Sequence, residues 1–322
     1  MTQEKAGFEV VRVEGNDLVV KVPCRESFVR IENTYAELFP MWVGRVLITA
    51  DIEKWALIAA RTATGFASSI IMSPAEAGIE GLATRDETPD GRIGILIQMY
   101  HRDRGSLRMQ MIYRIGQCVM TCPTAAAFDG LPKTRRKMKV GSALSLFGDG
   151  FQKKDVLNGR KIWRIPTMEG EFVVEDRFGT MRAVAGGLFL ILAENSTAGL
   201  KAAEASVEAI SQRVKYVVLP FPGGICRSGS KVGSMKYKLG ASTNQYFCPK
   251  LRTVVPDSNV PEGVNSVYEV VINGLDLNAV KQAMGEGIKA AAELSGVPRI
   301  TASNFSGKLG PYKVYLKEAL GL

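Results

Sequence analysis

Apolar runs of strand length alternate with amphipathic stretches of helical period along most of the chain. The first example is the apolar run at 45–50, after which Asp51 can cap a helix that Gly65 ends. A second apolar run at 67–72 and an exit loop at 73–80 complete a strand–helix–strand unit. The predicted inner face of this helix carries Trp55, Ile58, Ala59 and Thr62.

The same pattern returns in the next part of the chain. Predicted strands at 93–100 and 118–121 enclose a helix that Ser106 can cap, and an exit loop covers 122–130. The apolar face of this helix carries Leu107, Met111 and Ile115.

Two further units occupy the C-terminal half. Strands at 188–193 and 216–219 flank a helix that starts after Asn195, and strands at 267–273 and 299–303 flank the last helix. The glycine-containing loop NFSGKLG follows. The apolar faces of the two helices carry Leu200, Ala203, Val207 and Ile210 in the first, and Leu277, Val280, Met284 and Ile288 in the second.

The four units form two similar pairs roughly 140 residues apart, since VLITADIEKW resembles LFLILAENST and ILIQMYHRDR resembles EVVINGLDLN. We therefore predict an α+β fold of two similar lobes from an internal duplication, each a ferredoxin-like α/β sandwich. The predicted lobes are 31–167 and 168–322, with hairpin strands between 138 and 183. Residues 1–30 are predicted to form an N-terminal hairpin extension, because apolar and polar residues alternate on both sides of a Gly-Asn-Asp turn.

Composition excludes several classes of protein. Apolar residues make up 46% of the 322 residues, as in ordinary globular chains. The longest apolar run, 183–193, is about half of the roughly 20 residues that span a bilayer, and no signal segment starts the chain, so we expect a cytoplasmic protein without a membrane partner. Five scattered cysteines and a single histidine, His101, argue against a disulfide framework, a His-based zinc site and a Ser-His-Asp triad.

The formal net charge of +9 predicts an anionic partner. Only residues 133–139, KTRRKMK, form a dense basic run, and no nucleic-acid-binding motif accompanies it. The predicted strands carry aliphatic side chains on both faces, not the aromatic ones that stack on RNA bases. Anionic small molecules or an acidic partner subunit therefore fit better than nucleic acid.

The most distinctive loop lies within 215–233, KYVVLPFPGGICRSGSKVG, where a strand leads into a glycine-, serine- and lysine-rich turn. Such loops expose backbone N–H groups beside cations, which suits an anionic or carbonyl oxygen. It is not a Walker A loop, because Ser230 stands where that motif requires lysine. A turn-rich connector is the alternative interpretation. The candidate binding residues are Gly223, Gly224, Arg227, Ser228, Ser230 and Lys231.

Segments spread over 31–322 together resemble the formylmethanofuran:tetrahydromethanopterin formyltransferase family. They are ENTYAELFPMWVGRVLITA, TGFASSIIMSPAEAGIE, TPDGR, GQCVMTCPT, FGDGFQKKDVLNGRK, GEF, AVAGG, PFPGGICRSGSKVG, NSVYEVVINGLDLNAVKQAMGEGIKAA and SGKLGPYKVYL. Two features depart from the family pattern: residues 1–30 are extra, and the chain is basic whereas the archaeal members are acidic. The resemblance extends to bacterial members, which act inside a formyltransferase/hydrolase complex, so the host stays open.

The resemblance implies transfer of a formyl group from the amine of methanofuran, or of methylofuran, to N5 of tetrahydromethanopterin. It implies no metal and no covalently bound cofactor. It also implies a homo-oligomer, a dimer or a tetramer, with the active site in a cleft between subunits. Formylmethanofuran dehydrogenase/hydrolase subunits are candidate partners. The alternative function is a non-catalytic scaffolding subunit of the same fold, whose basic surface binds an acidic partner.

Glu269, within VYEVV, is the predicted catalytic residue. Transfer between two amines passes through a tetrahedral oxyanion and needs a proton carrier, for which a carboxyl is the natural group in a chain with one histidine. Apolar neighbours on a strand would bury Glu269 and raise its pKa, and the resemblance associates a functional glutamate with this Tyr-Glu segment. The alternative is a solvated glutamate on an outward strand face.

Other loops supply further candidates for substrate binding or proton transfer: Pro74, Glu76, Gly78 and Glu80 in SPAEAGIE, and Asp90 and Arg92 in TPDGR. Glu76 and Glu80 could instead stabilise a helix start, and Asp90 could be a turn residue. We expect Arg227, Ser228 and Lys231 to bind the anionic tail of a substrate. Trp42 and Tyr268 are candidates for stacking on a ring, whereas Trp55 fits the core and His101 the surface.

Overall fold

The computed structural model describes residues 9–15, 17–21 and 28–322. The chain divides into two compact units: a central unit of residues 40–183, and a terminal unit formed by the described residues up to Phe39 together with Val184–Leu322. These bounds differ from the predicted lobes. Residues 31–39 belong to the terminal unit, and residues 168–183 belong to the central unit. Strand β4 (Tyr35–Ala50) crosses one of the bounds without a break, and an unbroken strand leaves no boundary signal in the sequence.

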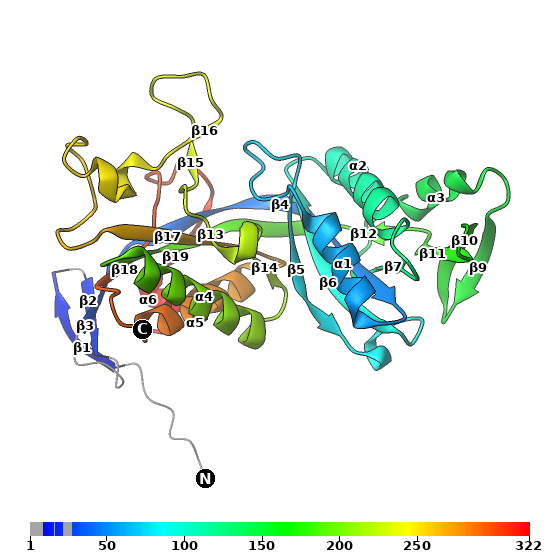
Figure 1. Cartoon of the computed structure of the whole chain (residues 1–322), viewed down its shortest axis with the longest axis horizontal. Helices are drawn as coiled ribbons and strands as arrows, with labels where there is room; N and C mark the ends of the chain where they lie inside the picture. Colours follow the sequence, from blue (N-terminus) through cyan, green and yellow to red (C-terminus); the bar gives the residue numbers. More distant parts are fainter. Residues whose placement is uncertain (1–8, 16, 22–27) are drawn as a thin grey trace, which may run out of the picture. The chain divides into compact units, whose positions relative to one another are not determined.

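The central unit is built on a strand–helix–strand–strand–helix–strand series (Figure 1). After β4 come α1 (Glu53–Thr64), β5 (Glu76–Ala83), β6 (Ile93–His101), α2 (Arg104–Arg114) and β7 (Ala126–Asp129). β6 pairs antiparallel with β4 and β5, and β4 pairs antiparallel with β7, so the spatial order is β5–β6–β4–β7. The main core of this unit includes Val46, Ile48, Ile97, Met99 and Leu107.

A meander extends this sheet, as the Gly-rich alternating stretch predicted. Its strands are β9 (Lys153–Leu157), β10 (Arg160–Pro166) and β11 (Glu171–Glu175), and β11 lies parallel to β7. Two short strands, β8 (Lys137–Met138) and β12 (Phe178–Gly179), pair separately, and α3 (Gly141–Leu144) lies between β8 and β9.

The terminal unit repeats the same order of elements. They are β13 (Met181–Ala193), α4 (Ser196–Arg213), β14 (Val217–Val218), β17 (Ser266–Gly274), α5 (Leu277–Ala292) and β18 (Arg299–Thr301). Antiparallel pairing gives the spatial order β14–β17–β13–β18, which matches the order in the central unit position by position. Asn195 and Asp276 cap α4 and α5 by accepting hydrogen bonds from backbone N–H groups three residues on.

The two ends of the chain add strands to the terminal unit. β3 (Phe28–Ile31) lies parallel to β18 and carries the hairpin of β1 (Glu9–Glu14) and β2 (Asp17–Lys21). This agrees with the predicted N-terminal hairpin for the described residues, whereas Asn16 of the predicted turn lies outside them. β19 (Tyr312–Tyr315) pairs with residues 35–38 of β4 and leads into α6 (Leu316–Ala319).

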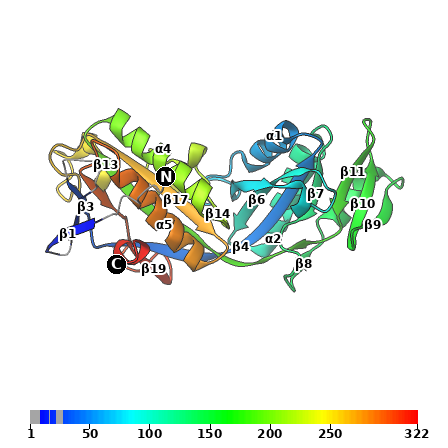
Figure 2. The ribbon, with the colours of Figure 1, turned by 90° about the horizontal axis from the view of Figure 1, so that it is seen from below.

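The sheet of the terminal unit has two differently covered faces. α4 and α5 lie side by side on one face, over a large core that includes Phe189, Ile191 and Ile272 (Figures 1 and 2). The segment 225–265, with the short hairpin of β15 (Lys231–Val232) and β16 (Ala241–Ser242), covers the other face (Figure 1). A small core of Leu190, Leu192, Val260 and Val264 lies under this segment.

Two predicted strands are wrong. Residues 67–72 form a turn, closed by hydrogen bonds between Ser69 and Ser73, and the strand is β5, in the stretch predicted as the exit loop. Gly78 and Gly81 hid this strand, because glycine is depleted in strands. Residues 118–121 belong to the end of the helical segment, where a π-helical turn at Ile115–Val119 continues α2, and the strand is β7.

The predicted face of α1 is also rotated. Its buried residues are Ala56, Ala59, Ala60 and Ala63, whereas Ile58 is exposed. Ile52, not Asp51, is the N-cap, and it makes no side-chain hydrogen bond there. Small alanine side chains let the helix lie close to the sheet, so the bulky residues do not mark the buried stripe.

Candidate active site

Glu269 lies on β17, on the sheet face opposite α4 and α5. Its side chain is only 2% exposed, while Tyr268 and Val270, its neighbours in the strand, pack with the helices. One carboxyl oxygen, Oε1, accepts a hydrogen bond of 2.5 Å from the Ser230 hydroxyl. The other oxygen, Oε2, is buried without a partner among the described residues. An unpartnered buried oxygen favours the protonated carboxyl, because an ion there would lack both water and a counter-charge.

Burial raises the pKa of Glu269, and the hydrogen bond from Ser230 lowers it by less. The carboxyl therefore keeps its proton to a higher pH than an exposed glutamic acid does. This agrees with the predicted environment of Glu269 and excludes, within the terminal unit, the solvated strand face that was its alternative.

Cys226 anchors the loop to Glu269. The two residues exchange backbone hydrogen bonds of 2.8 and 2.9 Å, which makes an isolated bridge beside β17. The Cys226 thiol is buried and lies 3.5 Å from the Ser228 hydroxyl. Burial, and next the nearby Glu269 carboxyl, raise the pKa of this thiol, so Cys226 is a neutral wall of the site and not an activated nucleophile.

Glu269 faces a small cavity of about 80 Å³, which we call the Glu269 cavity. Its walls come from β13, β17 and the loop segments 226–229 and 243–249. The lining residues are Leu190, Cys226, Arg227, Ser228, Gly229, Thr243, Asn244, Phe247, Cys248, Pro249, Val267 and Glu269.

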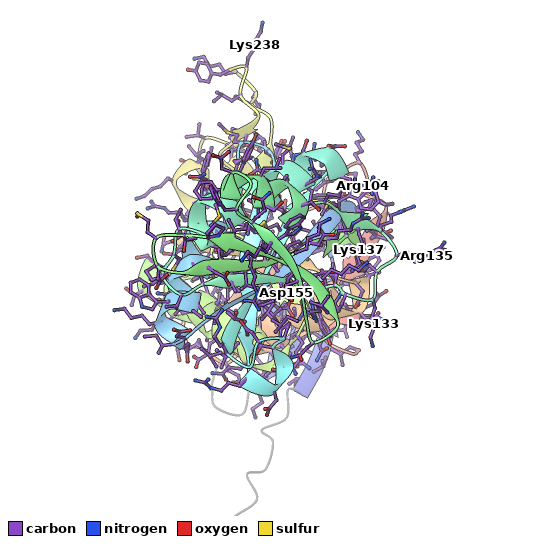
Figure 3. All side chains as sticks on the ribbon, turned by 90° about the vertical axis from the view of Figure 1, so that its right-hand side faces the viewer. Arg104, Lys133, Arg135, Lys137, Asp155 and Lys238 are labelled. Carbon is purple, nitrogen blue, oxygen red and sulfur yellow. The ribbon has the colours of Figure 1, made fainter. Side chains whose placement is uncertain are left out.

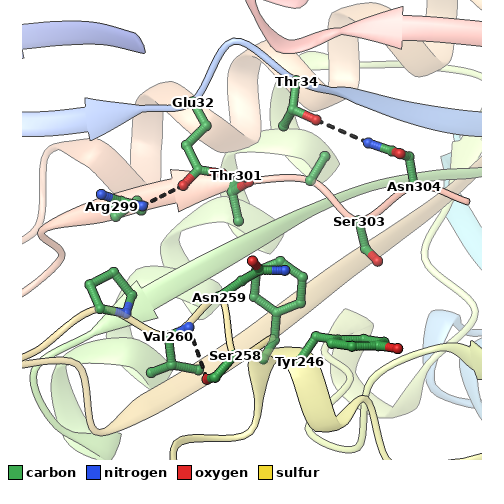
Figure 4. Close-up of a pocket in the computed structure, with 13 residues that line it drawn as sticks. Glu32, Thr34, Tyr246, Ser258, Asn259, Val260, Arg299, Thr301, Ser303 and Asn304 are labelled. Carbon is green, nitrogen blue, oxygen red and sulfur yellow. Dashed lines mark hydrogen bonds and ion pairs between the residues drawn. The ribbon is translucent and has the colours of Figure 1, made fainter. Parts of the chain in front are cut away.

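A larger polar pocket of about 590 Å³ lies on the same sheet face (Figure 4). In the strand register Leu190 is opposite Glu269 on one side and opposite Thr301 on the other, so all three side chains point to this face. Phe247 lines both spaces, and therefore the polar pocket adjoins the Glu269 cavity. The other lining residues are Glu32, Thr34, Tyr246, Ser258, Asn259, Val260, Pro261, Arg299, Thr301, Ala302, Ser303 and Asn304.

Hydrogen bonds fix the polar groups on one wall of this pocket. Glu32 accepts a hydrogen bond of 2.6 Å from Arg299 and a second one from the Thr301 hydroxyl, and Asn304 donates to Thr34 (Figure 4). A carboxylate and amides fixed around a roomy pocket can orient a polar ring by hydrogen bonds.

The loop residues predicted to bind an anion have different surroundings. Arg227 is exposed and has no hydrogen-bond partner among the described residues, so its guanidinium group is available at the mouth of the Glu269 cavity. The Lys231 ammonium donates to the Gln245 amide and lies 5.9 Å from the centroid of the Tyr246 ring. Lys231 therefore holds segment 243–246 against the loop.

Two candidates of this region have other roles. Tyr268 packs against Gly199 of α4, where a Cβ would lie 2.9 Å from the tyrosine ring, so it does not stack on a ligand beside Glu269. The strict alternation of a strand sends neighbouring residues to opposite faces. Gly224 is buried with φ +80°, and a Cβ there would meet Val207 at 2.8 Å, so it serves packing, whereas Gly223 is exposed with φ +61°.

The second glycine-containing loop, at 304–310, is already occupied by a carboxylate of the protein. The fully buried Glu37 accepts backbone hydrogen bonds from Phe305 (2.8 Å), Gly307 (2.5 Å) and Leu309 (2.8 Å). Burial raises the pKa of Glu37, but these three N–H groups and Lys313 outweigh it, and the pKa is lowered. This loop has no free N–H cradle for a substrate anion at that point.

The candidates in SPAEAGIE belong to the central unit. Glu76 and Gly78 are buried in strand β5, where Glu76 accepts a hydrogen bond from the Ile70 backbone, and Pro74 is exposed. Glu80 makes two hydrogen bonds of 2.6 and 2.7 Å with Arg45. Neither glutamate begins a helix, so the alternative interpretation, that they stabilise a helix start, is wrong.

Asp90 and Arg92 do lie together, in a pocket of about 450 Å³ of the central unit. Arg92 donates to Asp90 (2.9 Å), to Asp51 (2.9 Å) and to the backbone oxygen of Thr124 (2.6 Å). The Arg92 guanidinium thus ties three segments together and is already largely satisfied by protein groups.

Three arginines gather over Trp42 on the surface of the central unit. Arg182, Arg136 and Arg104 lie 4.5, 5.4 and 5.9 Å from the ring centroid. None of the three has an acidic partner among the residues that the structure describes. Figure 3 shows this side of the unit, with Arg104 and residues Lys133, Arg135 and Lys137 of the basic run. Trp42 is therefore covered by cations and is not an open stacking face.

The remaining candidates are structural. The His101 ring nitrogen Nδ1 accepts a hydrogen bond of 2.9 Å from the Asp103 backbone at the end of β6, and Trp55 packs on the central core. Residues 9–15, 17–21 and 28–322 contain no group of three His, Cys, Asp or Glu side chains that could hold a metal ion. In the same residues no helix combines the length and the apolar character that crossing a bilayer requires.

Sequence reasoning missed the polar pocket and one wall of the Glu269 cavity. Glu32, Asn304 and Asn244 come from connecting segments, and Arg299 begins a predicted strand, and only strand pairing and loop folding bring them to these two spaces. The one available signal was that Glu32 starts the first of the segments quoted above for the family resemblance.

Comparison with known proteins gives one consistent result. Residues 25–167 match the family model described as "Formylmethanofuran-tetrahydromethanopterin formyltransferase", and residues 170–319 match the model "FTR, proximal lobe". The formyltransferase of Methanopyrus kandleri is 54% identical over 294 residues, which cover 90% of this chain and 98% of the relative. That of Methanocaldococcus jannaschii is 53% identical over 294 residues.

Solved structures agree. The formyltransferase from Methanosarcina barkeri superposes with a TM-score of 0.87 at 48% identity, covering 90% of this chain and 98% of that one. A chain of the formyltransferase/hydrolase complex from Methylorubrum extorquens, solved with methylofuran, has a TM-score of 0.86 at 40% identity and covers 91% of this chain and 97% of its own.

Proposed function

The chain belongs to the formylmethanofuran–tetrahydromethanopterin formyltransferase family, and from this premise we propose that it moves a formyl group between the amine of methanofuran, or methylofuran, and N5 of tetrahydromethanopterin. The observation that carries the proposal is the Glu269 carboxyl, which is 2% exposed and has an unpartnered oxygen on the wall of a cavity. A buried acid that keeps its proton is the group that exchange between two amines requires.

In the proposed reaction the N5 lone pair attacks the formyl carbon, and the carbonyl π electrons move onto the oxygen. When the tetrahedral intermediate collapses, that electron pair forms the carbonyl again, and the bond to the methanofuran nitrogen breaks. The leaving nitrogen keeps the bond's electrons and takes a proton from Glu269, and Glu269 recovers a proton from N5. The net reaction consumes no proton and needs no redox partner.

The two spaces beside Glu269 support a proposed position for each substrate. The Glu269 cavity holds the reacting one-carbon group, and the adjoining polar pocket, with Glu32, Asn304 and Asn259, orients a heterocycle. Arg227 and Ser228 at the cavity wall bind an anionic tail. Holding both substrates in line could supply on the order of 7–11 kcal/mol of the barrier. Asp90 and Arg92, with Pro74, Glu76 and Gly78, remain proposed contacts of the central unit.

The test is transfer of the formyl group from formylmethanofuran to tetrahydromethanopterin, followed by absorbance of the formylated pterin. Purified protein should form it with saturation in both substrates, and the reverse reaction should run from the formylated pterin with the free furan amine. A folded protein that is inactive with both methanofuran and methylofuran would overturn the proposal.

A scaffolding role is the second candidate, and the arginine cluster over Trp42 favours it. Three cations that converge without an acidic partner in the described residues repel one another, so an anionic partner surface would stabilise them. Hydrolase subunits like those of the Methylorubrum extorquens complex are the proposed partners. Replacing Arg104, Arg136 and Arg182 by glutamine should abolish co-purification with such subunits and leave formyl transfer unchanged.

We also propose that the lobes 31–167 and 168–322 arose by duplication of a ferredoxin-like unit, and that the protein is a homo-oligomer. The equal strand orders of the two units support the duplication, and so do the ends of the family models at 167 and 170. Light scattering at several concentrations tests the oligomer, and a strictly monomeric protein contradicts it.

A further inference from the structure

Glu32 is the only acidic side chain among the described residues that line the polar pocket. Its backbone is fixed on both sides, because its N–H donates to the Ile300 oxygen (3.0 Å) and its own oxygen accepts from the Thr34 N–H (2.8 Å). The side chain is 26% exposed. The protein therefore holds this carboxylate in one place and leaves it open to a molecule in the pocket.

Each oxygen of the Glu32 carboxylate has one hydrogen-bond donor. Arg299 donates to Oε1 (2.6 Å) and the Thr301 hydroxyl donates to Oε2, and the described residues supply no other donor. A carboxylate has about four acceptor sites, two at each oxygen. Both donors come from β18, so the unused site on each oxygen is available to a ligand. Together the two oxygens form a forked acceptor for two neighbouring N–H groups.

The two proposed substrates differ in the groups that such a fork binds. A furan ring has one oxygen and no N–H group, whereas a pterin has a 2-amino group beside a ring N3–H on one edge of its pyrimidine ring. The size of the pocket, about 590 Å³, is in the range of small-molecule sites. Figure 4 shows Glu32 and Thr301 on one side of the pocket and Tyr246 and Asn259 on the other. The chemistry of the pocket thus matches the pterin and not the furan.

We propose that Glu32 binds the pyrimidine edge of tetrahydromethanopterin by accepting hydrogen bonds from N3–H and the 2-amino group. This inference rests on the proposed function and names the substrate that the polar pocket takes. N5 belongs to the other ring of the pterin, and the pocket shares Phe247 with the Glu269 cavity. With its pyrimidine edge on Glu32, the pterin has its N5 ring on the side of that cavity.

The first experiment compares Glu32→Gln with wild type. Glutamine keeps the shape of the side chain but replaces one oxygen by an NH₂ group, which faces an N–H group of the ring. Losing a hydrogen bond to a charged group weakens binding by roughly 10- to 100-fold. We expect the Kd and the KM for tetrahydromethanopterin to rise by that factor, while kcat and the KM for formylmethanofuran stay unchanged, because the contact serves binding of one substrate.

Glu286→Gln is the matched control. Glu286 also pairs with an arginine, Arg213 (3.0 Å), but it lies on α5 and lines neither the polar pocket nor the Glu269 cavity. This variant should keep wild-type values for both substrates. An unchanged pterin KM in Glu32→Gln, or a raised KM for formylmethanofuran, overturns the assignment. An equal loss in both variants contradicts it too, since the effect would then follow from a broken ion pair and not from a ligand contact.

A second measurement does not depend on turnover. Calorimetric titration compares 6-methyltetrahydropterin with 6-methyltetrahydrolumazine, which has a carbonyl oxygen in place of the 2-amino group. Wild type should bind the pterin roughly 10- to 100-fold more tightly, because the carbonyl oxygen meets the carboxylate without a hydrogen. Glu32→Gln should lose or reverse this preference, since its NH₂ group can donate to that carbonyl.

The titration separates this inference from the proposed function. If the protein transfers no formyl group, the proposed function fails, and the preference between the two rings still decides the role of Glu32. Equal affinities in wild type, a preference that Glu32→Gln retains, or no binding of the pterin contradicts the inference.

Discussion

Two glutamates of the terminal unit are almost completely buried, yet their surroundings push their pKa values in opposite directions. Glu37 is 0% exposed and receives three backbone N–H groups, and its pKa is lowered. Glu269 is 2% exposed and receives one hydroxyl, and its pKa is raised by burial. Glu37 receives three backbone donors and has Lys313 nearby, whereas Glu269 receives one hydroxyl and lies deeper among protein atoms, and together these differences separate the two pKa values.

The difference shows which of the two is built for the reaction. Glu37 closes the loop at 304–310 as a satisfied ion, and such a network stabilises the fold. Glu269 has one unpartnered oxygen beside a cavity, and a buried oxygen without a partner lowers the stability of the fold. Such an arrangement is expected where a ligand or a proton binds to that oxygen. Substitution of Glu269 should therefore reduce activity, and substitution of Glu37 should reduce stability.

The largest expected effect is on catalysis at Glu269. Glu269→Gln keeps the shape and removes the mobile proton, so formyl transfer should fall by about 100-fold or more. Steady-state rates at saturating substrates measure it, and the far-ultraviolet spectrum controls for folding. Near-normal activity would move the proton-transfer role to another carboxyl, such as Glu76, Glu80 or Asp90.

Glu37→Gln should instead reduce stability. In wild type both Glu37 oxygens accept from backbone N–H groups. The glutamine NH₂ group replaces one of these oxygens, so at least one N–H group faces a donor, and leaving a buried donor unsatisfied costs about 1–3 kcal/mol. Urea unfolding at pH 7 measures the free energy of unfolding. Glu37→Gln with unchanged stability would show that the three N–H groups find other acceptors. The matched variant Glu269→Gln should be no less stable than wild type.

The pH dependence of stability should differ in sign between the two variants. An unfolded glutamate has a pKa near 4.3. The lowered pKa of Glu37 gives stability that is present above this value and is lost as the pH falls through the folded pKa. Because the pKa of Glu269 is raised, the folded state loses stability as the pH rises from the unfolded pKa to the folded pKa.

Unfolding curves between pH 3 and pH 9 test this comparison. The stability deficit of Glu37→Gln should shrink in acid, and the relative stability of Glu269→Gln should grow with increasing pH. Parallel pH curves for the two variants would contradict the opposite pKa shifts.

The smallest expected effect comes from Ser230→Ala. It removes one hydrogen bond from Glu269 Oε1, a loss of about 0.5–1.5 kcal/mol. That hydrogen bond lowers the pKa of Glu269 against the larger effect of burial, so its loss should move the alkaline limb of the activity profile to higher pH. Rates of wild type and Ser230→Ala between pH 6 and pH 10 measure the shift. An unchanged profile would mean that Ser230 does not act on the carboxyl.

Hydrophobic periodicity predicted most of the elements but missed two strands whose sequences lack the usual apolar pattern. β5 contains Gly78 and Gly81, and β7 has only four residues, AAFD, a stretch that reads equally as a loop. α1 buries alanines, while its large apolar residue Ile58 faces outward. In each case packing against the rest of the unit outweighed local propensity.

By itself the sequence determined the two series of strands and helices, the family, and the apolar neighbours that bury Glu269. Tertiary structure alone decided which glutamate is ionised, because Glu37 takes its hydrogen bonds from residues 268 or more positions along the chain. It also brought Asn244 to the Glu269 cavity and Thr301 to the polar pocket. Periodicity reports which side of an element is buried, whereas hydrogen-bond partners and cavities depend on which elements meet.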